Sequence, residues 1–345
     1  GAFGVQILAM GAILQTATGI SLIPAALIAS IVTLAYTWSG GILAVTLTDA
    51  VQYVIIVIGV TLCAYLAIDH LGGVDAMMSI LYSNPRFETN MKPLANWSLV
   101  QFLGLFFSFL LGEFCAPYYI QRYASTKSAK DSKNGLLIFG VHWIFFMATT
   151  AAIGLASMAI QPDVKPDLAF TNLIRDVLPI GVTGLVFGAL LAAVMSTGAA
   201  MINTSAVIYT RDIYNKFINT AATQAQLLRQ SRLSTLVVGG ISIGVAIIFQ
   251  DVFGLMIYMF KLWPSAILPP LMCGLLWGKI SPYAGAPAVI AGGLSFFLWS
   301  DKVLGEPFGI PANFIGIGMN CLVLFFVHQK MKGHKPEGPF LPDLN

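Results

Sequence analysis

The sequence predicts an all-α protein that is integral to a membrane. Of its 345 residues, 57% are hydrophobic and only 10% are charged, whereas a soluble domain has about 45–50% apolar and about 25% charged residues. The apolar residues fall into segments of about 20, the length that an α-helix needs to cross a hydrocarbon layer of about 30 Å. We expect one multi-span membrane domain over residues 1–345, without a separate soluble part.

By this length criterion about ten spans are expected. They cover residues 1–17, 21–38, 43–68, 97–120, 135–160, 180–210, 231–249, 252–276, 283–300 and 308–329. The charges and turn residues collect in the connections 69–96, 121–134, 161–179 and 211–230. Gly1 already lies in an apolar segment, so we expect a fragment that lacks its natural N-terminus.

Alternating spans would place 12 of the 18 Lys and Arg residues on one side and 5 on the other, with Lys261 inside a span. The positive-inside rule then puts 122–133, 211–232 and the C-terminal tail in the cytoplasm, and 69–96 and 161–179 outside. The net charge of +3 is spread over loops rather than gathered in a patch, so nucleic acid is not expected as a partner.

The span at 180–210 carries a face of small and hydroxylated residues at helical spacing. These are Gly184, Gly188, Ala192, Ala193, Ser196, Thr197, Ala200 and Thr204. The Ala193 carbonyl and the Ser196 and Thr197 hydroxyls offer hard oxygen ligands to a small cation. The alternative is a tight helix contact in which the hydroxyls bond back to the preceding turn.

Three charged residues lie inside spans, where a charge is costly and indicates function. Asp49 is near the predicted cytoplasmic start of its span, so an interfacial position is the alternative. Glu113 precedes Cys115-Ala116-Pro117, where proline removes a backbone donor. Lys261 shares its span with Pro264, Pro269 and Pro270, and it either lines a cavity at a kink or snorkels to the interface.

Four stretches resemble the sodium:solute symporter family. They are YTWSGGILAV at 36–45 followed by Thr48, Asp49 and Gln52; PYYIQR at 117–122; AAVMST at 192–197 with RDIY at 211–214; and Pro269-Pro270 with Lys279, Gly285-Ala286 and Gly292-Gly293. The interval from Lys279 to Gly285 is one residue longer than the family pattern. The resemblance covers residues 36–293.

This resemblance implies a LeuT-type inverted-repeat transporter fold that lacks the first two core helices. Residues 1–68 would end the first repeat, 97–276 would form the second, and 283–329 would be additional helices. The implied function is secondary active transport in the plasma membrane, a sodium-coupled symport of a small organic solute by alternating access. Sodium, the solute and the lipid bilayer are the implied partners.

In this family the sodium site includes the residues that match Ala193, Ser196 and Thr197, and Tyr118 matches a gating tyrosine. Members with a second sodium have hydroxyls where this chain has Ala199 and Ala200. We therefore expect Asp49 to lie on the sodium exit path rather than in a second tight site.

The family's sugar carriers have amide side chains where this chain has Ala116-Pro117, which favours an amino acid or carboxylate over a sugar. Lys261 and Glu113 are then the candidate residues on the substrate side, with Lys261 as a counter-charge.

The competing functions are a solute-sensing receptor or a channel on the same fold, and a membrane enzyme. No H-E-x-x-H or G-x-S-x-G motif occurs in the sequence, and no carboxylates or histidines are paired at a catalytic spacing. An enzyme is therefore not expected.

Overall fold

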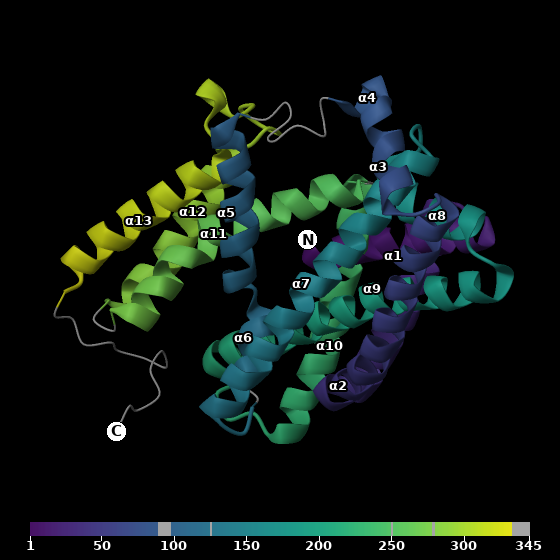
Figure 1. Cartoon of the computed structure of the whole chain (residues 1–345). Helices are drawn as coiled ribbons and strands as arrows, with labels where there is room; N and C mark the ends of the chain where they lie inside the picture. Colours follow the sequence, from purple (N-terminus) through teal and green to yellow (C-terminus); the bar gives the residue numbers. More distant parts are fainter. Residues whose placement is uncertain (89–97, 125, 250, 278–279, 333–345) are drawn as a thin grey trace. The chain divides into compact units, whose positions relative to one another are not determined.

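The computed structural model describes residues 1–88, 98–124, 126–249, 251–277 and 280–332, and the regular elements in these ranges are helices (Figure 1). The α-helices are α1 (Ala2–Thr18), α2 (Leu22–His70), α3 (Val74–Ser83), α4 (Pro85–Glu88), α5 (Leu99–Cys115), α6 (Pro117–Ala124), α7 (Ala129–Ile160), α8 (Pro166–Val177), α9 (Ile180–Ile208), α10 (Gln224–Phe249), α11 (Val252–Leu276), α12 (Gly285–Trp299) and α13 (Ala312–Lys330). A π-helix, η1 (Tyr209–Ile218), extends α9, and two short 3₁₀ turns are η2 (Pro282–Ala284) and η3 (Pro307–Gly309).

Nine segments of the described chain are long and apolar enough to cross a membrane. They match nine of the predicted spans, and the tenth corresponds to α1, which is shorter at 17 residues. The motif residue Lys279 lies outside the described residues.

The predicted connection at 39–42 is wrong, because the backbone stays helical from Leu22 to His70. A straight helix of 49 residues would be about 74 Å long, more than twice the hydrocarbon thickness of about 30 Å. Two parts of α2, Leu22–Gly40 and Val45–His70, each have membrane length, so α2 supplies two spans without an intervening loop.

Three predicted connections also contain helices. Residues 69–96 include the short α3 and α4, 161–179 include α8, and helical backbone continues through η1 into 211–230. The α3 and α8 segments are amphipathic: Met77, Leu81, Leu173 and Ile174 are buried in one hydrophobic cluster. Sequence periodicity missed them because each is only 10 or 12 residues long.

Beside this cluster, polar contacts tie the end of α8 to the end of α7. The Gln161 side-chain amide donates to the Asp176 carboxylate at 2.7 Å, and Arg175 donates to the same carboxylate at 2.7 Å. The Arg175 guanidinium holds the pKa of the Asp176 carboxyl below its usual range.

The chain divides into two compact units. The first comprises residues 1–95, 123–212 and 222–255, and the second comprises 96–122, 213–221 and 256–345. In the first unit small residues let helices approach closely: a methyl group at Gly11 would lie 2.7 Å from the Ala26 Cβ, and one at Gly59 would lie 2.6 Å from the Ala189 Cβ. These contacts join α1 to α2 and α2 to α9.

In the second unit, α13 repairs a gap in the hydrogen bonds of α11. Pro269 and Pro270 have no N–H, so the carbonyls of Ser265 and Ala266, four residues earlier, lose their helical donors. The Asn320 side-chain amide donates to both, at 3.0 and 2.7 Å. This one side chain lets α11 remain helical through its proline pair.

Candidate functional site

The three proposed sodium ligands lie together on α9. The Ser196 hydroxyl donates to the Ala193 carbonyl at 2.9 Å, and the Thr197 hydroxyl donates to the same carbonyl at 3.1 Å. Ligands at right angles around a hard cation of 2.3–2.6 Å bond length are about 3.3–3.7 Å apart. Each hydroxyl oxygen therefore needs only a small shift away from the Ala193 carbonyl oxygen, and a rotation of its hydrogen, for the two oxygens to face a cation together.

Hydrogen bonds of this kind, from a hydroxyl to a carbonyl one turn earlier, also occur in helices that bind no ion. The packing around α9 is therefore needed to distinguish an ion site from a helix contact. Gly184 and Gly188 have open space: no atom of the described chain lies within 4 Å of a methyl group placed there. Ala192, Ala200 and Thr204, farther along the same face, are buried, with exposed fractions of 7%, 6% and 5%. Within the described chain the hydroxyl-bearing face is thus open at Gly184 and Gly188 and packed against other residues at these three positions.

A tyrosine from the first resemblance stretch fixes α2 against this part of α9. The Tyr36 hydroxyl donates to the Met195 carbonyl at 3.0 Å, and Met195 lies between Ala193 and Ser196 in the sequence. The hydrogen bond therefore positions the backbone turn that carries the three oxygens.

Asp49 belongs to the same region. It is half-buried and acts electrostatically on the Tyr36 phenol.

The second unit contains a break inside the predicted span 97–120, next to the proline that removes a backbone donor. Ala116 has extended backbone angles (φ −68°, ψ 113°) between α5 and α6, and Pro117 begins α6. Glu113 lies one turn before the break. Its carboxylate takes a hydrogen bond from the Tyr119 hydroxyl, while its Oε2 atom is buried without a hydrogen-bond donor in the described part of the chain.

Tyr118 lies just after this break in an aromatic cluster. Its side chain is 8% exposed, and its ring centroid lies 4.5 Å from that of Tyr119 and 6.2 Å from that of Trp263. The cluster continues through Phe260, 5.6 Å from Trp263, to Phe109. The predicted gating residue is therefore packed between α5, α6 and α11.

Lys261 lines a cavity of about 340 Å³ in the second unit. Its ammonium nitrogen is 3.0 Å from Oε1 of Glu306, in the connection between α12 and α13. Sequence reasoning missed Glu306, because it counted charges only inside spans and nothing in the sequence pairs residues 45 positions apart. Lys261 thus lines this cavity and has a carboxylate partner, and its role as a counter-charge for the solute stays a prediction.

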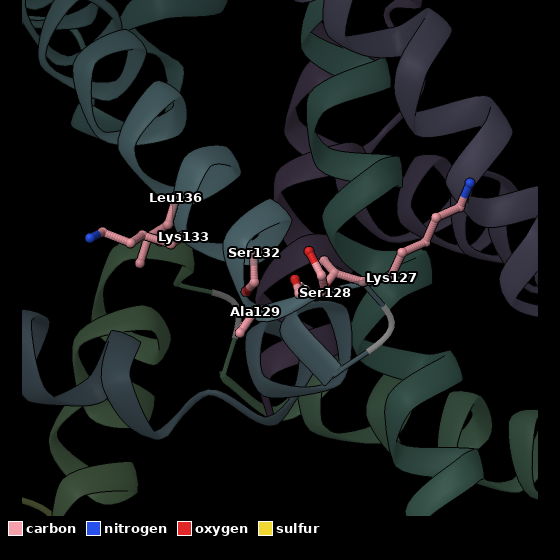
Figure 2. A pocket seen from close by; sticks show the side chains of 7 residues that line it. Lys127, Ser128, Ala129, Ser132, Lys133 and Leu136 are labelled. Atoms are coloured by element: carbon pink, nitrogen blue, oxygen red, sulfur yellow. Dashed lines mark hydrogen bonds between the residues drawn. The ribbon is translucent and has the colours of Figure 1, made fainter.

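A larger cavity of about 660 Å³ lies at the start of α7, in the first unit. Ser128 caps the helix there by accepting from the Asp131 backbone N–H at 3.1 Å. Figure 2 shows Lys127 and Lys133 pointing away from each other, so their charges do not converge on one ligand position.

These features define a class of protein before any comparison is made. It is a multi-span α-helical membrane protein with a broken helix, hydroxyl oxygens in the middle of a span, and few intramembrane charges, as in LeuT-type secondary transporters. The sequence pattern of the sodium:solute symporter family matches residues 1–292. The chain belongs to that family, whose members here are transporters rather than enzymes, and it is a multi-pass protein of the plasma membrane.

Several curated relatives and a solved structure resemble the chain. The osmoregulated proline transporter OpuE of Bacillus subtilis is 27% identical over 286 residues, which are 80% of this chain and 56% of the relative. The sodium/glucose cotransporter of Vibrio parahaemolyticus is 27% identical over 317 residues, 81% of this chain and 58% of the relative.

The solved structure is a substrate-bound, outward-open sodium-coupled sialic acid symporter. It matches with a TM-score of 0.67 at 20% identity, over 98% of this chain and 75% of that one, and this likeness confirms the predicted fold. The chain spans little more than half the length of the two curated relatives.

Proposed function

We propose that the full-length protein is a symporter that uses a sodium gradient to carry a small zwitterionic or carboxylate solute across the plasma membrane by alternating access. Family membership supports the transport class. The observation that carries the sodium proposal is the convergence of the Ala193, Ser196 and Thr197 oxygens in the middle of α9.

In this proposal Ala193, Ser196 and Thr197 supply part of a neutral oxygen shell for sodium. Neutral ligands leave the ion's charge partly uncompensated, so binding is weak enough for release in every cycle. Asp49 lies on the exit path, where its carboxylate attracts the departing cation. The Tyr36 hydrogen bond to Met195 couples α2 to the ion-binding turn.

The broken helix supplies the solute side. Tyr118, packed in the aromatic cluster, is the proposed gate, and the buried Oε2 atom of Glu113 is an acceptor next to the break. The relatives differ in cargo, since their names include proline and glucose. Ala116 and Pro117 offer no side-chain hydrogen bonds to sugar hydroxyls, which is why we favour an amino acid or carboxylate.

Uptake into proteoliposomes tests this function. The full-length protein should accumulate radiolabelled L-proline, L-alanine or lactate above the outside concentration when an inward sodium gradient is applied, and should not do so when potassium replaces sodium. D-Glucose is the sugar comparison and should be carried least. A channel can equilibrate a solute but cannot concentrate it, and a sensor moves none. Sodium-independent equilibration or no uptake of any solute would therefore overturn the proposal.

A further inference from the structure

The cavity beside Lys261 has the components of a binding site that the transport proposal does not use. Its lining combines an ion pair with an amide and apolar side chains. The lining residues are Gln101, Gly104, Leu105, Ile257, Lys261, Glu306 and Pro311. All of them belong to the second compact unit. Its volume of about 340 Å³ is at the low end for ligand pockets, which suits a small molecule.

The two charges at the cavity retain unused hydrogen-bonding capacity. Lys261 has three N–H donors, and one of them points to Glu306 at 3.0 Å. The Oε1 atom of Glu306 accepts two hydrogen bonds, one from Lys261 and one from the Ala312 backbone N–H at 3.1 Å. Within the described ranges no hydrogen bond reaches its Oε2. Both side chains are partly accessible, at 22% and 24%.

The connection that carries Glu306 has an unfavourable backbone. Glu306 (φ 49°) and Phe308 (φ 60°) are the two non-glycine residues with positive φ in the described chain. Such conformations persist only where surrounding contacts hold them, and they gather at ligand clamps and active sites. Here the Ala312 N–H holds Glu306, and the Trp299 indole donates to the Ile310 carbonyl at 3.0 Å. The connection therefore presents the carboxylate to the cavity.

This cavity is separate from the break in the α5–α6 helix. Gly104 lies twelve residues before Ala116, a distance of about 18 Å along a helix. The predicted topology puts the beginning of the 97–120 span and the connection after the 283–300 span on the external side. The cavity would then be open to the medium rather than to the middle of the membrane.

We propose that this cavity binds a small zwitterion, an amino acid or a betaine, by its two opposite charges. The ligand carboxylate takes the free N–H groups of Lys261, and the ligand's cationic group lies against Oε2 of Glu306. The Lys261–Glu306 pair stays intact, and the four charges alternate in sign. A plain carboxylate would meet the repulsion of Glu306, and a plain amine would meet that of Lys261, so only a zwitterion gains from both. This outer site is additional to the transport site and requires no sodium.

Protection of a cysteine tests the site directly. Leu105→Cys is placed in the full-length protein, with the exposed Cys321 replaced by serine, and its reaction with a neutral maleimide is followed in detergent without sodium. L-Proline, L-alanine and glycine betaine are the zwitterions. Tetrahydro-2-furoate replaces the ring nitrogen of proline with oxygen, and pyrrolidine lacks the carboxylate, so each keeps a five-membered ring but carries one charge. At least one zwitterion should slow labelling threefold or more, and the single-charge compounds should not.

Matched variants connect the protection to the ion pair. Glu306→Gln keeps an oxygen that can accept from the Ala312 N–H but removes the negative charge. Lys261→Met keeps the length of the side chain but removes the positive charge. Each variant should abolish protection of Leu105→Cys by the zwitterion. Lys302→Gln alters an exposed lysine of the same connection, 61% accessible and 3.7 Å from Asp301, and should preserve it. Ser132→Cys, at the start of α7 in the first unit, is not part of the cavity lining and should label at the same rate with and without zwitterion.

The outcomes separate this site from the transport proposal. Protection should persist in a Ser196→Ala/Thr197→Ala background, whether or not that background transports. If no zwitterion protects Leu105→Cys, or if protection survives both Glu306→Gln and Lys261→Met, the ion pair is only a tie between α11 and the connection, and the proposal is wrong. Should both charge variants fail to fold, the comparison of proline with its two single-charge analogues decides alone.

Discussion

At the scale of single residues, the α9 oxygens show why a hydroxyl face has two physical interpretations. A hydroxyl that donates to a carbonyl one turn earlier is satisfied without any ion. The same hydroxyl retains lone pairs, and two such hydroxyls on one carbonyl concentrate acceptor oxygens at one point. The two interpretations differ in what they predict when one hydroxyl oxygen is removed.

Ser196→Ala and Thr197→Ala each delete one proposed ligand without adding bulk. We expect each to raise the sodium concentration for half-maximal uptake at least tenfold, which corresponds to about 1.4 kcal/mol. Ser205→Ala is the matched control: its hydroxyl bonds back to the Met201 carbonyl at 2.8 Å on the same helix, but it is exposed and away from the three oxygens. The measurement is uptake against sodium concentration, normalised to the amount of protein.

A sodium dependence that stays at the parental value in both alanine variants would show that the hydroxyls only serve the helix. Equal losses in Ser196→Ala and in Ser205→Ala would point to the same conclusion, since helix back-bonding is all that the two serines share.

At the scale of helices, proline pairs and broken helices remove backbone hydrogen bonds that lipid cannot replace. The α11 helix solves this with Asn320 of α13. Close packing makes the arrangement possible: a methyl group at Gly292 would overlap the Ser265 carbonyl and one at Gly316 would lie 2.6 Å from the Ser265 Cβ. The α13 helix thus stabilises α11 through one amide group.

Asn320→Leu should leave the Ser265 and Ala266 carbonyls buried without donors. An unsatisfied buried polar group costs about 1–3 kcal/mol, so we expect a clear fall in the thermal unfolding temperature in detergent. Pro269→Ala/Pro270→Ala restores two helical N–H groups, and adding it to Asn320→Leu should recover most of the loss. Cys321→Ser, at an exposed neighbouring position, should change little. The idea fails if the two alanines give no recovery.

At the scale of the whole molecule, composition and segment length predicted the fold class and the positions of the spans, because the membrane imposes one length on every crossing helix. Helical spacing and the family motifs indicated the residues of the oxygen set. The break at Ala116 was not predicted, although Pro117 was noted as a residue without a backbone donor. Contacts between residues far apart in the sequence could not be predicted. The ion pair of Glu306 with Lys261 and the hydrogen bond of Asn320 to Ser265 form only through tertiary packing. The continuity of α2 was missed because glycines at 40 and 41 indicate a turn locally, while a helix can also bend there.

Two contacts within the first unit join segments that the alternation of spans predicts to lie on the same side of the membrane. Residues of 69–96 and 161–179, both predicted outside, share one hydrophobic cluster. Trp38 and Arg232, which flank connections predicted to be cytoplasmic, form a cation–π contact with 5.6 Å between the guanidinium carbon and the ring centroid. Such pairings follow from the alternation of spans, whereas the absolute orientation depends only on the charge asymmetry.

The orientation can be tested with single cysteines in the full-length protein in intact cells. Lys165→Cys, before α8, should react with a membrane-impermeant maleimide from outside, and Lys130→Cys, at the start of α7, should not. Both positions are exposed, so a difference in labelling reports the side of the membrane rather than burial.

In inverted vesicles the two positions should exchange their reactivity, which controls for a cysteine that reacts slowly on either side. Because α7 alone separates residue 130 from residue 165, labelling of both from one side would mean that α7 does not cross the membrane. The opposite pattern would keep every span but reverse the protein, and would place the Lys261–Glu306 cavity on the cytoplasmic side.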